Sequence, residues 1–276
     1  MTRFDQLIDA LYRDMPDIKH IAERVDYFSA KFLNLPYCGN PQGEGDHAEF
    51  DQSPLYRFDC FDCVTYVNNT LALSFSDNLA YFKKNLLKLN YYDSQAQYEN
   101  RFHFMSIDWN IQNQKNHFLK DVTKTIGESE LAIGIIDKPN WFLKRDQNDI
   151  KPFKKTIDDK KIIALKNLSK LFKAELASLA YLPTQKVLEH NTLKKIPHGA
   201  IIEIVRPNWD LVEKIGTHIH VSHIGFAIYK NNALYFRHAS SEHQKTEEVL
   251  MENYLKNTLK NPLIKGINIQ IALASR

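Results

Sequence analysis

One of the three cysteines in this chain occupies a position suited to nucleophilic chemistry. Cys63 stands in the segment DCFDCVTYV, where a loop rich in glycine and proline gives way to a helical pattern. Asp62, just before it, is a residue type that caps helix N-termini. A thiol in the first turn lies near unpaired N–H groups and the positive end of the helix dipole, which favour the reactive thiolate. Because the same N–H groups can bind an oxyanion, the position predicts a catalytic cysteine.

Other roles for the cysteines stay open. A cysteine can pack as a small apolar residue. Cys60 and Cys63 also form a C-x-x-C pair, which occurs in thioredoxin-like redox sites and as half of a zinc site. No second C-x-x-C is present and Cys38 lies in a distant loop, so neither role is favoured. The small, odd number of cysteines does not indicate a disulfide framework, and we expect all three to be reduced.

Two of the eleven histidines are related by a predicted β-hairpin. The runs SHIGFAIY and ALYFRHAS flank a turn at Asn231 and Asn232, and asparagine is favoured where a turn requires positive φ. A loop centred on these residues places Gly225 opposite His238. Because strand residues two apart share a face, His223 becomes a diagonal neighbour of His238, about 7 Å away at Cβ or less. A three-residue loop would place the two histidines on opposite faces.

These positions suggest a complete set of groups for covalent catalysis. His223 is the predicted base for Cys63, and His238 fixes the orientation and tautomer of His223. That arrangement follows the logic of nucleophile, base and orienting group. A metal cluster that uses His218 and His220 lacks carboxylates at ligand spacing. We therefore predict no metal and no organic cofactor.

A second group of residues is predicted to bind substrate. The segment RFHFMSIDW concentrates an arginine that suits a peptide carboxylate and a tryptophan that suits a sugar or an apolar face. The alternative is an Arg–Asp pair with the tryptophan in the core. A loop tyrosine is a candidate oxyanion donor or a packing residue, and the aspartate before the nucleophile is a candidate contact or a helix cap. The predicted substrate-binding residues are Arg101, His103, Asp108, Trp109, Tyr56 and Asp62.

Hydrophobic periodicity supplies the elements that position these residues. Helices are expected within residues 1–33 (broken at Pro16) and at 62–75, 77–89, 160–179, 184–191 and 246–257. Strands are expected at 130–137, 200–205, 221–229, 233–238 and 266–273, and a long irregular loop at 34–59. Helices followed by an antiparallel sheet, with a helical insertion between them, indicate an α+β fold.

Composition excludes several classes of protein. The 276 residues are 43% apolar and 25% charged, as in an ordinary globular protein. The formal net charge of +3 argues against nucleic acid as a partner. The sequence contains no run of about 18 apolar residues, the length that a helix needs to span a membrane. The charged first residues lack the apolar core of a signal peptide, so the chain is cytoplasmic or its leader is absent from this sequence.

The segments DCVTYVNNTLAL, RFHFMSIDW, SHIGFAIY and RHAS occur in this order from the first helices to the C-terminal sheet. Together they resemble the N-acetylmuramoyl-L-alanine amidase-like bacterial family, which is similar to the NlpC-type branch of papain-like cysteine hydrolases. The resemblance implies a papain-like α+β core in which N-terminal helices pack on an antiparallel sheet. It assigns the roles of nucleophile, base and orienting residue to Cys63, His223 and His238. Asn68 and Asn69 depart from the pattern, because a glutamate is expected in this helix segment.

The resemblance also implies a function and a domain plan. The expected activity is hydrolysis of an amide or peptide bond in peptidoglycan stem peptides through an acyl-thioester, in the cell envelope or outside the cell. The alternatives are an acyl or amide transferase on the same fold, a non-catalytic cell-wall binding module, and a redox or zinc protein. One domain is expected over residues 1–276, with a helical N-terminal extension at 1–35. A helical insertion at about 110–195 is expected to cover the cleft.

Overall fold

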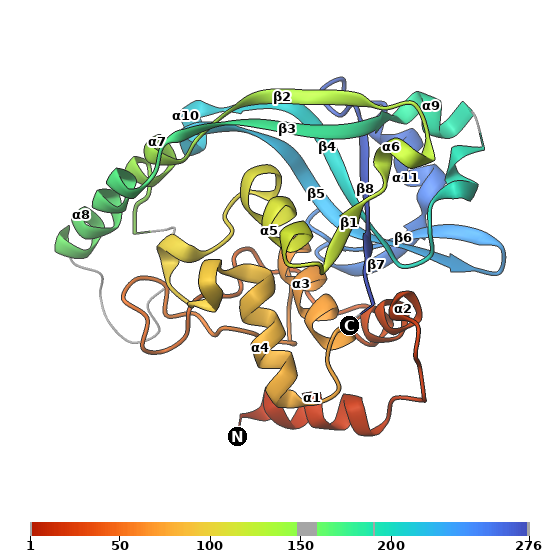
Figure 1. Cartoon of the computed structure of the whole chain (residues 1–276), viewed down its shortest axis with the longest axis horizontal. Coiled ribbons are helices and arrows are strands. Elements are labelled where there is room, and N and C mark those ends of the chain that lie inside the picture. The colour runs from red at the N-terminus through yellow and green to blue at the C-terminus, as the bar shows by residue number, and fades with distance from the viewer. Residues whose placement is uncertain (1, 148–158, 190, 275–276) are drawn as a thin grey trace.

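Helices pack against both faces of an antiparallel sheet in the computed structural model, which describes residues 2–147, 159–189 and 191–274 (Figure 1). The eight strands follow the order β2-β3-β8-β4-β5-β6-β7, with β1 paired to β8. This arrangement confirms the predicted α+β class. The strands are β1 (Leu119–Asp121), β2 (Glu130–Asp137), β3 (Ala174–Pro183), β4 (Ala200–Leu211), β5 (Thr217–Lys230), β6 (Ala233–Ser240), β7 (Lys245–Leu250) and β8 (Gly266–Ala272).

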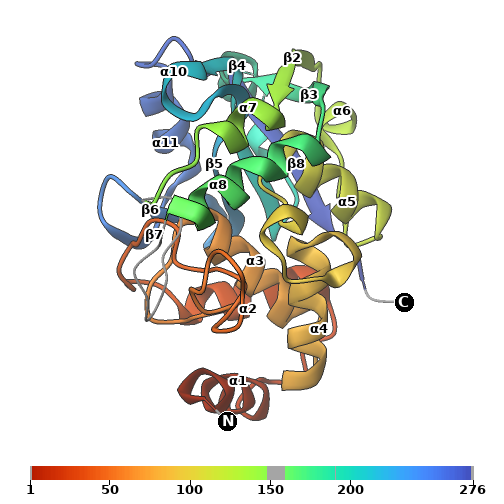
Figure 2. The ribbon, with the colours of Figure 1, turned by 90° about the vertical axis from the view of Figure 1, so that its left-hand side faces the viewer.

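Four longer helices precede the sheet in the chain, and shorter ones connect the strands (Figure 2). They are α1 (Arg3–Arg13), α2 (Ile21–Lys31), α3 (Cys63–Ser74), α4 (Leu79–Asn90), α5 (Asn110–Lys115), α6 (Thr123–Ile126), α7 (Lys138–Leu143), α8 (Asp159–Asn167), α9 (Thr184–Glu189), α10 (Val212–Ile215) and α11 (Met251–Thr258). A π-helical turn spans Met105–Trp109. Within the described ranges, no helix has both the length and the apolar surface needed to cross a bilayer.

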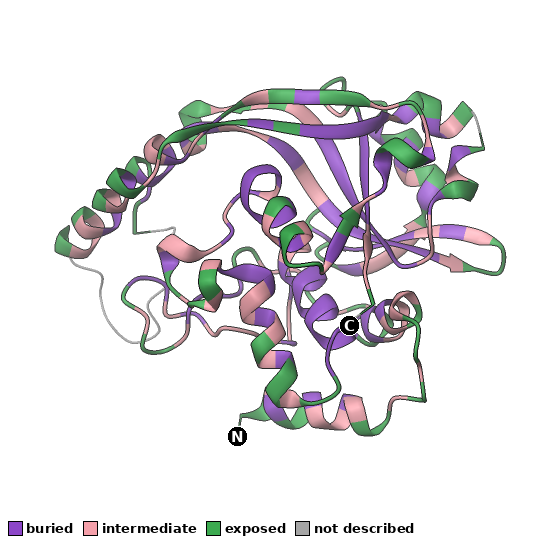
Figure 3. Cartoon of the chain, in the orientation of Figure 1, coloured by how far each residue is buried: buried purple, intermediate pink, exposed green. Residues whose placement is uncertain are grey.

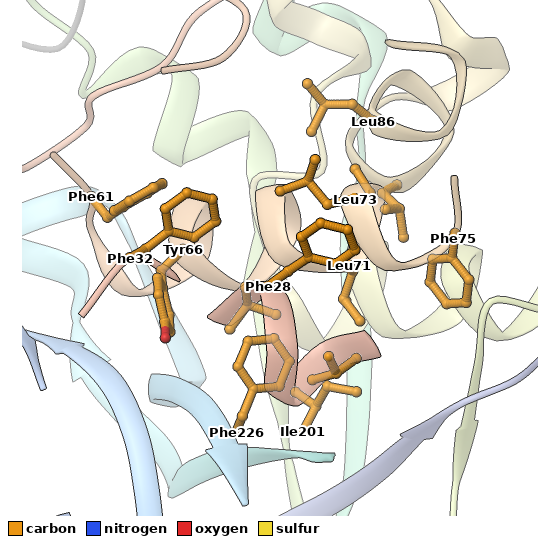
Figure 4. Packing of buried hydrophobic residues seen from close by; sticks show 14 of the residues in the cluster. Phe28, Phe32, Phe61, Tyr66, Leu71, Leu73, Phe75, Leu86, Ile201 and Phe226 are labelled. Carbon is orange, nitrogen blue, oxygen red and sulfur yellow. The ribbon is translucent and has the colours of Figure 1, made fainter. Parts of the chain in front are cut away.

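The main core surrounds α3, whose residues from Thr65 to Ser74 are all buried. Figure 4 shows Leu71 of α3 between Phe28 of α2 and Phe226 of β5. Complete burial of a Leu or Phe side chain contributes about 1.5–3 kcal/mol, so this packing strongly fixes α3 against the sheet. The start of α3 is therefore held at a defined position beside β5.

The β5–β6 hairpin has the register expected from the sequence. Tyr229 pairs with Leu234, and both turn residues, Asn231 and Asn232, have positive φ. A Cβ atom added to Gly225 would lie 2.8 Å from the Cβ of His238, so glycine allows the close approach of this side chain. The prediction of a loop centred on the two asparagines is confirmed.

Two predicted helices are partly wrong. Within 160–179, the helical residues end at Leu171, and the chain continues as β3 from Ala174. Within 246–257, β7 occupies the first residues and α11 the remainder. Alanine, leucine and glutamate favour helices locally, but hydrogen bonding to a neighbouring strand overrides that preference.

The predicted helical insertion at about 110–195 also contains strands. β2 pairs along its whole length with residues 174–181 of β3, and the two strands form a two-stranded arm. The arm packs across the extended ends of β4 and β5, where Ala132 and Leu179 join Val205 and Val221 in one buried cluster (Figure 3). Gly134 is needed for this approach, because an added Cβ would lie 2.2 Å from the Oδ1 atom of Asn208.

A disulfide joins Cys38 and Cys60, so the expectation that all three cysteines are reduced was wrong. Cys63 is the free cysteine. Backbone hydrogen bonds beside the disulfide bring the two segments together: the N–H of Cys38 donates to the carbonyl of Phe61, and the N–H of Phe61 to that of Pro36. The redox and zinc alternatives lose their basis, because Cys60 is bonded to Cys38 and not to Cys63.

Loss of this disulfide should destabilise the protein. The bond closes a loop with a sequence separation of 22 residues. A loop of this size predicts a loss of about 3 kcal/mol in the free energy of unfolding for the Cys38→Ser/Cys60→Ser variant. Urea unfolding followed by circular dichroism measures the change. An unchanged unfolding midpoint would show that the disulfide does not constrain the unfolded chain, and Cys63→Ser is the control for replacement of a thiol alone.

Candidate active site

Cys63 is the first residue of α3, and a capping box fixes this start. The Asp62 carboxylate accepts a hydrogen bond from the N–H of Thr65 at 2.8 Å, and the Thr65 hydroxyl accepts one from the N–H of Asp62 at 3.1 Å. These contacts satisfy N–H groups that have no partner within the helix. Asp62 therefore acts as the helix cap, one of the two roles that its sequence position suggested.

The thiol of Cys63 points toward β5. The backbone N–H of Ile224, the residue after His223, interacts with the sulfur. Two tyrosines lie near Cys63. Burial, and then the negative charge of a Cys63 thiolate, raises the pKa of Tyr37 to about 12 and also raises the pKa of Tyr254. The ring centroid of Tyr254 lies 6.5 Å from that of His223. Tyr254 therefore lies near both Cys63 and the ring of His223.

The two histidines form the hydrogen bond expected from the hairpin register. Nε2 of His223 lies 2.7 Å from Nδ1 of His238. On the other side of the His238 ring, Nε2 lies 3.7 Å from Oε1 of Glu247, which pairs with His238 across β6 and β7. This distance is too long for a hydrogen bond, and Nε2 has no other partner among the described residues, but a proton on it would face the carboxylate and leave Nδ1 as an acceptor. His223 then donates through Nε2 and keeps a basic lone pair on Nδ1.

A buried arginine holds β6 in place beside this pair. Arg237 donates from NH1 to the Asp26 carboxylate and to the Ser29 hydroxyl of α2, each at 2.7 Å. Its Nε donates to Glu248 at 2.7 Å. Charge-assisted hydrogen bonds to carboxylates are short and strong, so they restrict the position of the neighbouring His238.

Burial keeps both reactive groups neutral. Desolvation, followed by the charge of Asp62, raises the pKa of Cys63 to about 12, although the N–H groups of Ile224, Cys63 and Val64 oppose the rise. Desolvation lowers the pKa of His223 to about 4. It also lowers the pKa of His238 to about 2, with help from His223 and His243. The helix start was expected to favour a thiolate, but the loss of hydration outweighs the N–H groups.

The alkylation rate of Cys63 tests this electrostatic description. A raised thiol pKa and a lowered imidazole pKa mean that the free protein holds thiol and neutral imidazole at pH 7. Iodoacetamide should therefore react slowly at pH 6–7, and the rate should rise continuously above pH 8.5. The rate is followed by mass spectrometry of the Cys63 peptide. A plateau of fast reaction below pH 7 that disappears in His223→Ala would instead demonstrate a thiolate–imidazolium pair.

Two cavities are lined by the candidate catalytic residues or by their neighbours in the sequence. The larger, about 430 Å³, contains His223 and His238 in its wall. Its charged and polar walls also include Arg206, Ser240, Tyr254, Asn257 and Lys260. The smaller, about 180 Å³, is lined by Val64, Phe102, His103, Phe104, Met105, Ser106, Ile136, Ile219, His220 and Val221. Val64 follows Cys63 in the sequence and Val221 precedes His223 by two residues, so neighbours of both candidate groups line the smaller cavity.

The predicted substrate-binding residues are mostly engaged in structural contacts. Arg101 donates from Nε to Glu44 at 2.6 Å and from NH2 to Asp51 at 3.0 Å, so its partners are not the nearby aspartate of its own segment. Asp108 is completely buried and accepts hydrogen bonds from the Tyr92 hydroxyl at 2.7 Å and from Lys138. Both charged groups already have partners.

The remaining predicted residues differ in their access to the site. Trp109 is buried in the core and donates from Nε1 to Oδ1 of Asn68 at 2.8 Å, which gives this unexpected asparagine a structural function. Tyr56 donates to Asp5 of α1, away from the cavities. His103 lines the smaller cavity, and its ring contacts the carbonyl of Tyr98 at 2.7 Å. Of the predicted binding residues, His103 is the one that forms part of a cavity wall.

Sequence reasoning missed three residues of the site. Tyr254 reaches the histidines from α11, with its ring centroid 5.4 Å from that of His238. Tyr37 comes from the long loop, and Glu247 from a segment that was predicted to be helical. Correct assignment of 245–250 as a strand would have placed Glu247 opposite His238. Among the described residues, no group of three or more His, Cys, Asp or Glu side chains is arranged to hold a metal ion.

Comparison with known proteins adds to this geometry. A family model described as AmiA-like: N-acetylmuramoyl-L-alanine amidase-like matches residues 27–263. A crystal structure of a protein from Legionella pneumophila str. Philadelphia 1 superposes with a TM-score of 0.95 at 38% identity, covering 98% of this chain and 95% of that one. An N-acetylmuramoyl-L-alanine amidase from Bacteroides uniformis gives a TM-score of 0.66 at 25% identity, covering 91% and 98%. No curated protein sequence matches the chain.

Proposed function

The chain belongs to the N-acetylmuramoyl-L-alanine amidase-like family, and on this premise we propose that it is a cysteine hydrolase of peptidoglycan fragments. The proposed substrate bond is the amide between the N-acetylmuramoyl group and the L-alanine of the stem peptide. The name of the Bacteroides uniformis structure supports this choice of bond. The observation that carries the proposal is the contact of the Cys63 sulfur with the backbone N–H of Ile224, the residue after His223. Nε2 of His223 in turn lies 2.7 Å from Nδ1 of His238.

In the first half of the proposed reaction, Cys63 attacks the amide carbonyl carbon. Nδ1 of His223 takes the thiol proton as the carbon–sulfur bond forms, because the thiol is neutral in the free protein. The carbonyl oxygen becomes an oxyanion, and the backbone N–H of Cys63 at the start of α3 is positioned to donate to it. Collapse of the tetrahedral intermediate breaks the carbon–nitrogen bond, and the leaving amine receives the proton from His223.

In the second half, water hydrolyses the acyl-thioester. His223 takes a proton from water, which attacks the same carbonyl carbon, and the proton then returns to the departing sulfur. His238 holds the His223 ring through Nε2 throughout both steps. The negative charge of Glu247, 3.7 Å from Nε2 of His238, favours the His238 tautomer that accepts this hydrogen bond. The products are a free carboxylic acid and the amine of the released peptide.

This arrangement supports a relationship to papain-like hydrolases of the NlpC type. A nucleophile opens a buried helix, and the base and orienting residue lie on adjacent antiparallel strands. The Cys38–Cys60 disulfide supports action in an oxidising compartment, such as the cell envelope or outside the cell, where structural disulfides persist. The free thiol of Cys63 is kept apart from that disulfide as the first residue of the helix.

Mass spectrometry of digested muropeptides tests the proposed bond. Purified muropeptides are incubated with the protein, and the expected products are a free N-acetylmuramic acid end and a peptide that begins with L-alanine. Reaction in ¹⁸O-labelled water should place one label on the muramoyl carboxylate. Cleavage within the stem peptide would change the bond assignment. An intact muropeptide, or a product that carries an added amine in place of water, would contradict hydrolysis.

A further inference from the structure

We propose that Arg206 binds a carboxylate of the substrate in the larger cavity, an inference that rests on the proposed function. Arg206 lies on β4 and lines the same cavity as His223 and His238. Tyr254, which contacts both histidine rings, also interacts electrostatically with Arg206. The guanidinium is therefore placed beside the reacting groups.

A bulge in β4 turns Arg206 out of the regular strand pairing. Val205 pairs with Val221 and Trp209 with Ile219, so residues 206–208 lie opposite His220 alone. Such bulges redirect side chains and occur frequently next to active sites. Nδ1 of His220 accepts a hydrogen bond from the N–H of Asn208 at 2.9 Å, and Asn208 has a left-handed φ of 49°. The chain thus adopts a locally unfavourable conformation in which Arg206 reaches the cavity.

Arg206 has no acidic partner among the described residues. Its Nε atom is buried and makes no hydrogen bond, and the guanidinium carbon lies 4.2 Å from the ring centroid of Trp209. The guanidinium thus lies over the face of the indole and forms no ion pair with an acidic side chain among the described residues. Burial without a nearby carboxylate also lowers the pKa of Arg206. By contrast, the half-buried Arg101 and the buried Arg237 each contact two acidic side chains.

An anionic ligand would supply the negative charge that Arg206 lacks among its neighbours. Arginine presents a planar fork of donors that matches the two oxygens of a carboxylate. Lys260 adds a second positive charge, whereas Glu242 is the acidic residue in the cavity wall and is exposed. Serine and asparagine side chains in the same wall can donate further hydrogen bonds to a peptide. The cavity therefore suits a peptide that carries a free carboxylate close to the scissile amide.

The test compares two probes that differ only in charge: N-acetylmuramoyl-L-alanyl-D-glutamate and the same compound with both carboxylates converted to carboxamides. Binding is measured by calorimetry to Cys63→Ala protein, which cannot turn over. The acid should bind at least about tenfold more tightly than the diamide, since charge-assisted bidentate contacts are among the strongest polar interactions. Arg206→Ala in this background should remove the preference, and Arg206→Lys should keep only part of it.

Lys256→Ala is the matched control, because Lys256 lies on α11 outside the cavity and pairs with Glu252. It should leave the preference unchanged. Equal binding of the acid and the diamide, an undiminished preference in Arg206→Ala, or no binding of either probe would overturn the inference. Its failure is distinguishable from failure of the proposed function: a charge preference that depends on Arg206, together with intact muropeptides after incubation with the unmodified protein, would leave the binding site standing without the hydrolase.

Discussion

Replacement of Cys63 by serine should lower kcat/KM for muropeptide hydrolysis by at least about 10⁴-fold, the size of effect seen when a nucleophile is removed from a catalytic triad. The serine hydroxyl is nearly the same size as the thiol. It is a much weaker nucleophile, because oxygen is less polarisable than sulfur. Folding should be preserved because serine is close to cysteine in size and the Asp62 capping box stays intact. Product release followed by liquid chromatography measures the loss.

The disulfide variant provides the matched control for this prediction. Cys38→Ser/Cys60→Ser retains Cys63 and removes the other two cysteines. Measured at a temperature where it remains folded, this variant should retain activity. Loss of activity in the folded disulfide variant, combined with activity in Cys63→Ser, would transfer the chemistry to the disulfide and contradict the assignment of the nucleophile.

Replacement of His223 by alanine should lower kcat/KM by at least about 10³-fold, because the neutral thiol then has no base to accept its proton. The dependence on a base follows from the raised pKa of Cys63, which leaves almost no thiolate at pH 7. If the thiol were already ionised, the loss would be smaller. The kinetics are measured with the same muropeptide over a range of pH.

The dependence of kcat/KM on pH tests the pKa of His223 separately. Desolvation lowers the pKa of His223 to about 4, so the ring is unprotonated at pH 5. Its ability to accept a proton is lost only as the pH falls through about 4. The acid limb of kcat/KM should therefore lie well below the ordinary histidine pKa of about 6.5. An acid limb near 6.5 would show that the free site is more hydrated than the structure indicates.

Substitutions of His238 test whether this residue acts by orienting the ring of His223. His238→Ala should lower kcat/KM by about 10–100-fold, the effect typical of a residue that orients another ligand or base. His238→Asn keeps an amide oxygen in reach of Nε2 of His223 and should recover part of the activity. Equal and complete loss in both variants would indicate a role beyond orientation.

Local rules in the sequence determined the two halves of the candidate site. An aspartate, a cysteine and a threonine at the end of a glycine- and proline-rich loop are sufficient to start a helix at Cys63, because capping depends on residues within one turn. Two asparagines between alternating apolar residues fixed the β5–β6 register, because the period of a strand is two. Short-range geometry alone therefore predicted the contact between His223 and His238.

Contacts between distant segments decided the rest. β3 has helix-forming residues, and its strand conformation depends on hydrogen bonds to β2. The pairing of Cys38 with Cys60, the burial that sets the pKa of Cys63, and the arrival of Tyr254 from α11 all depend on how the chain packs in space. Desolvation and side-chain pairing are properties of the surroundings in three dimensions, which residue spacing along one segment does not encode. The sequence therefore predicted the candidate catalytic groups, whereas the tertiary structure decided their protonation, their partners and the cavity beside them.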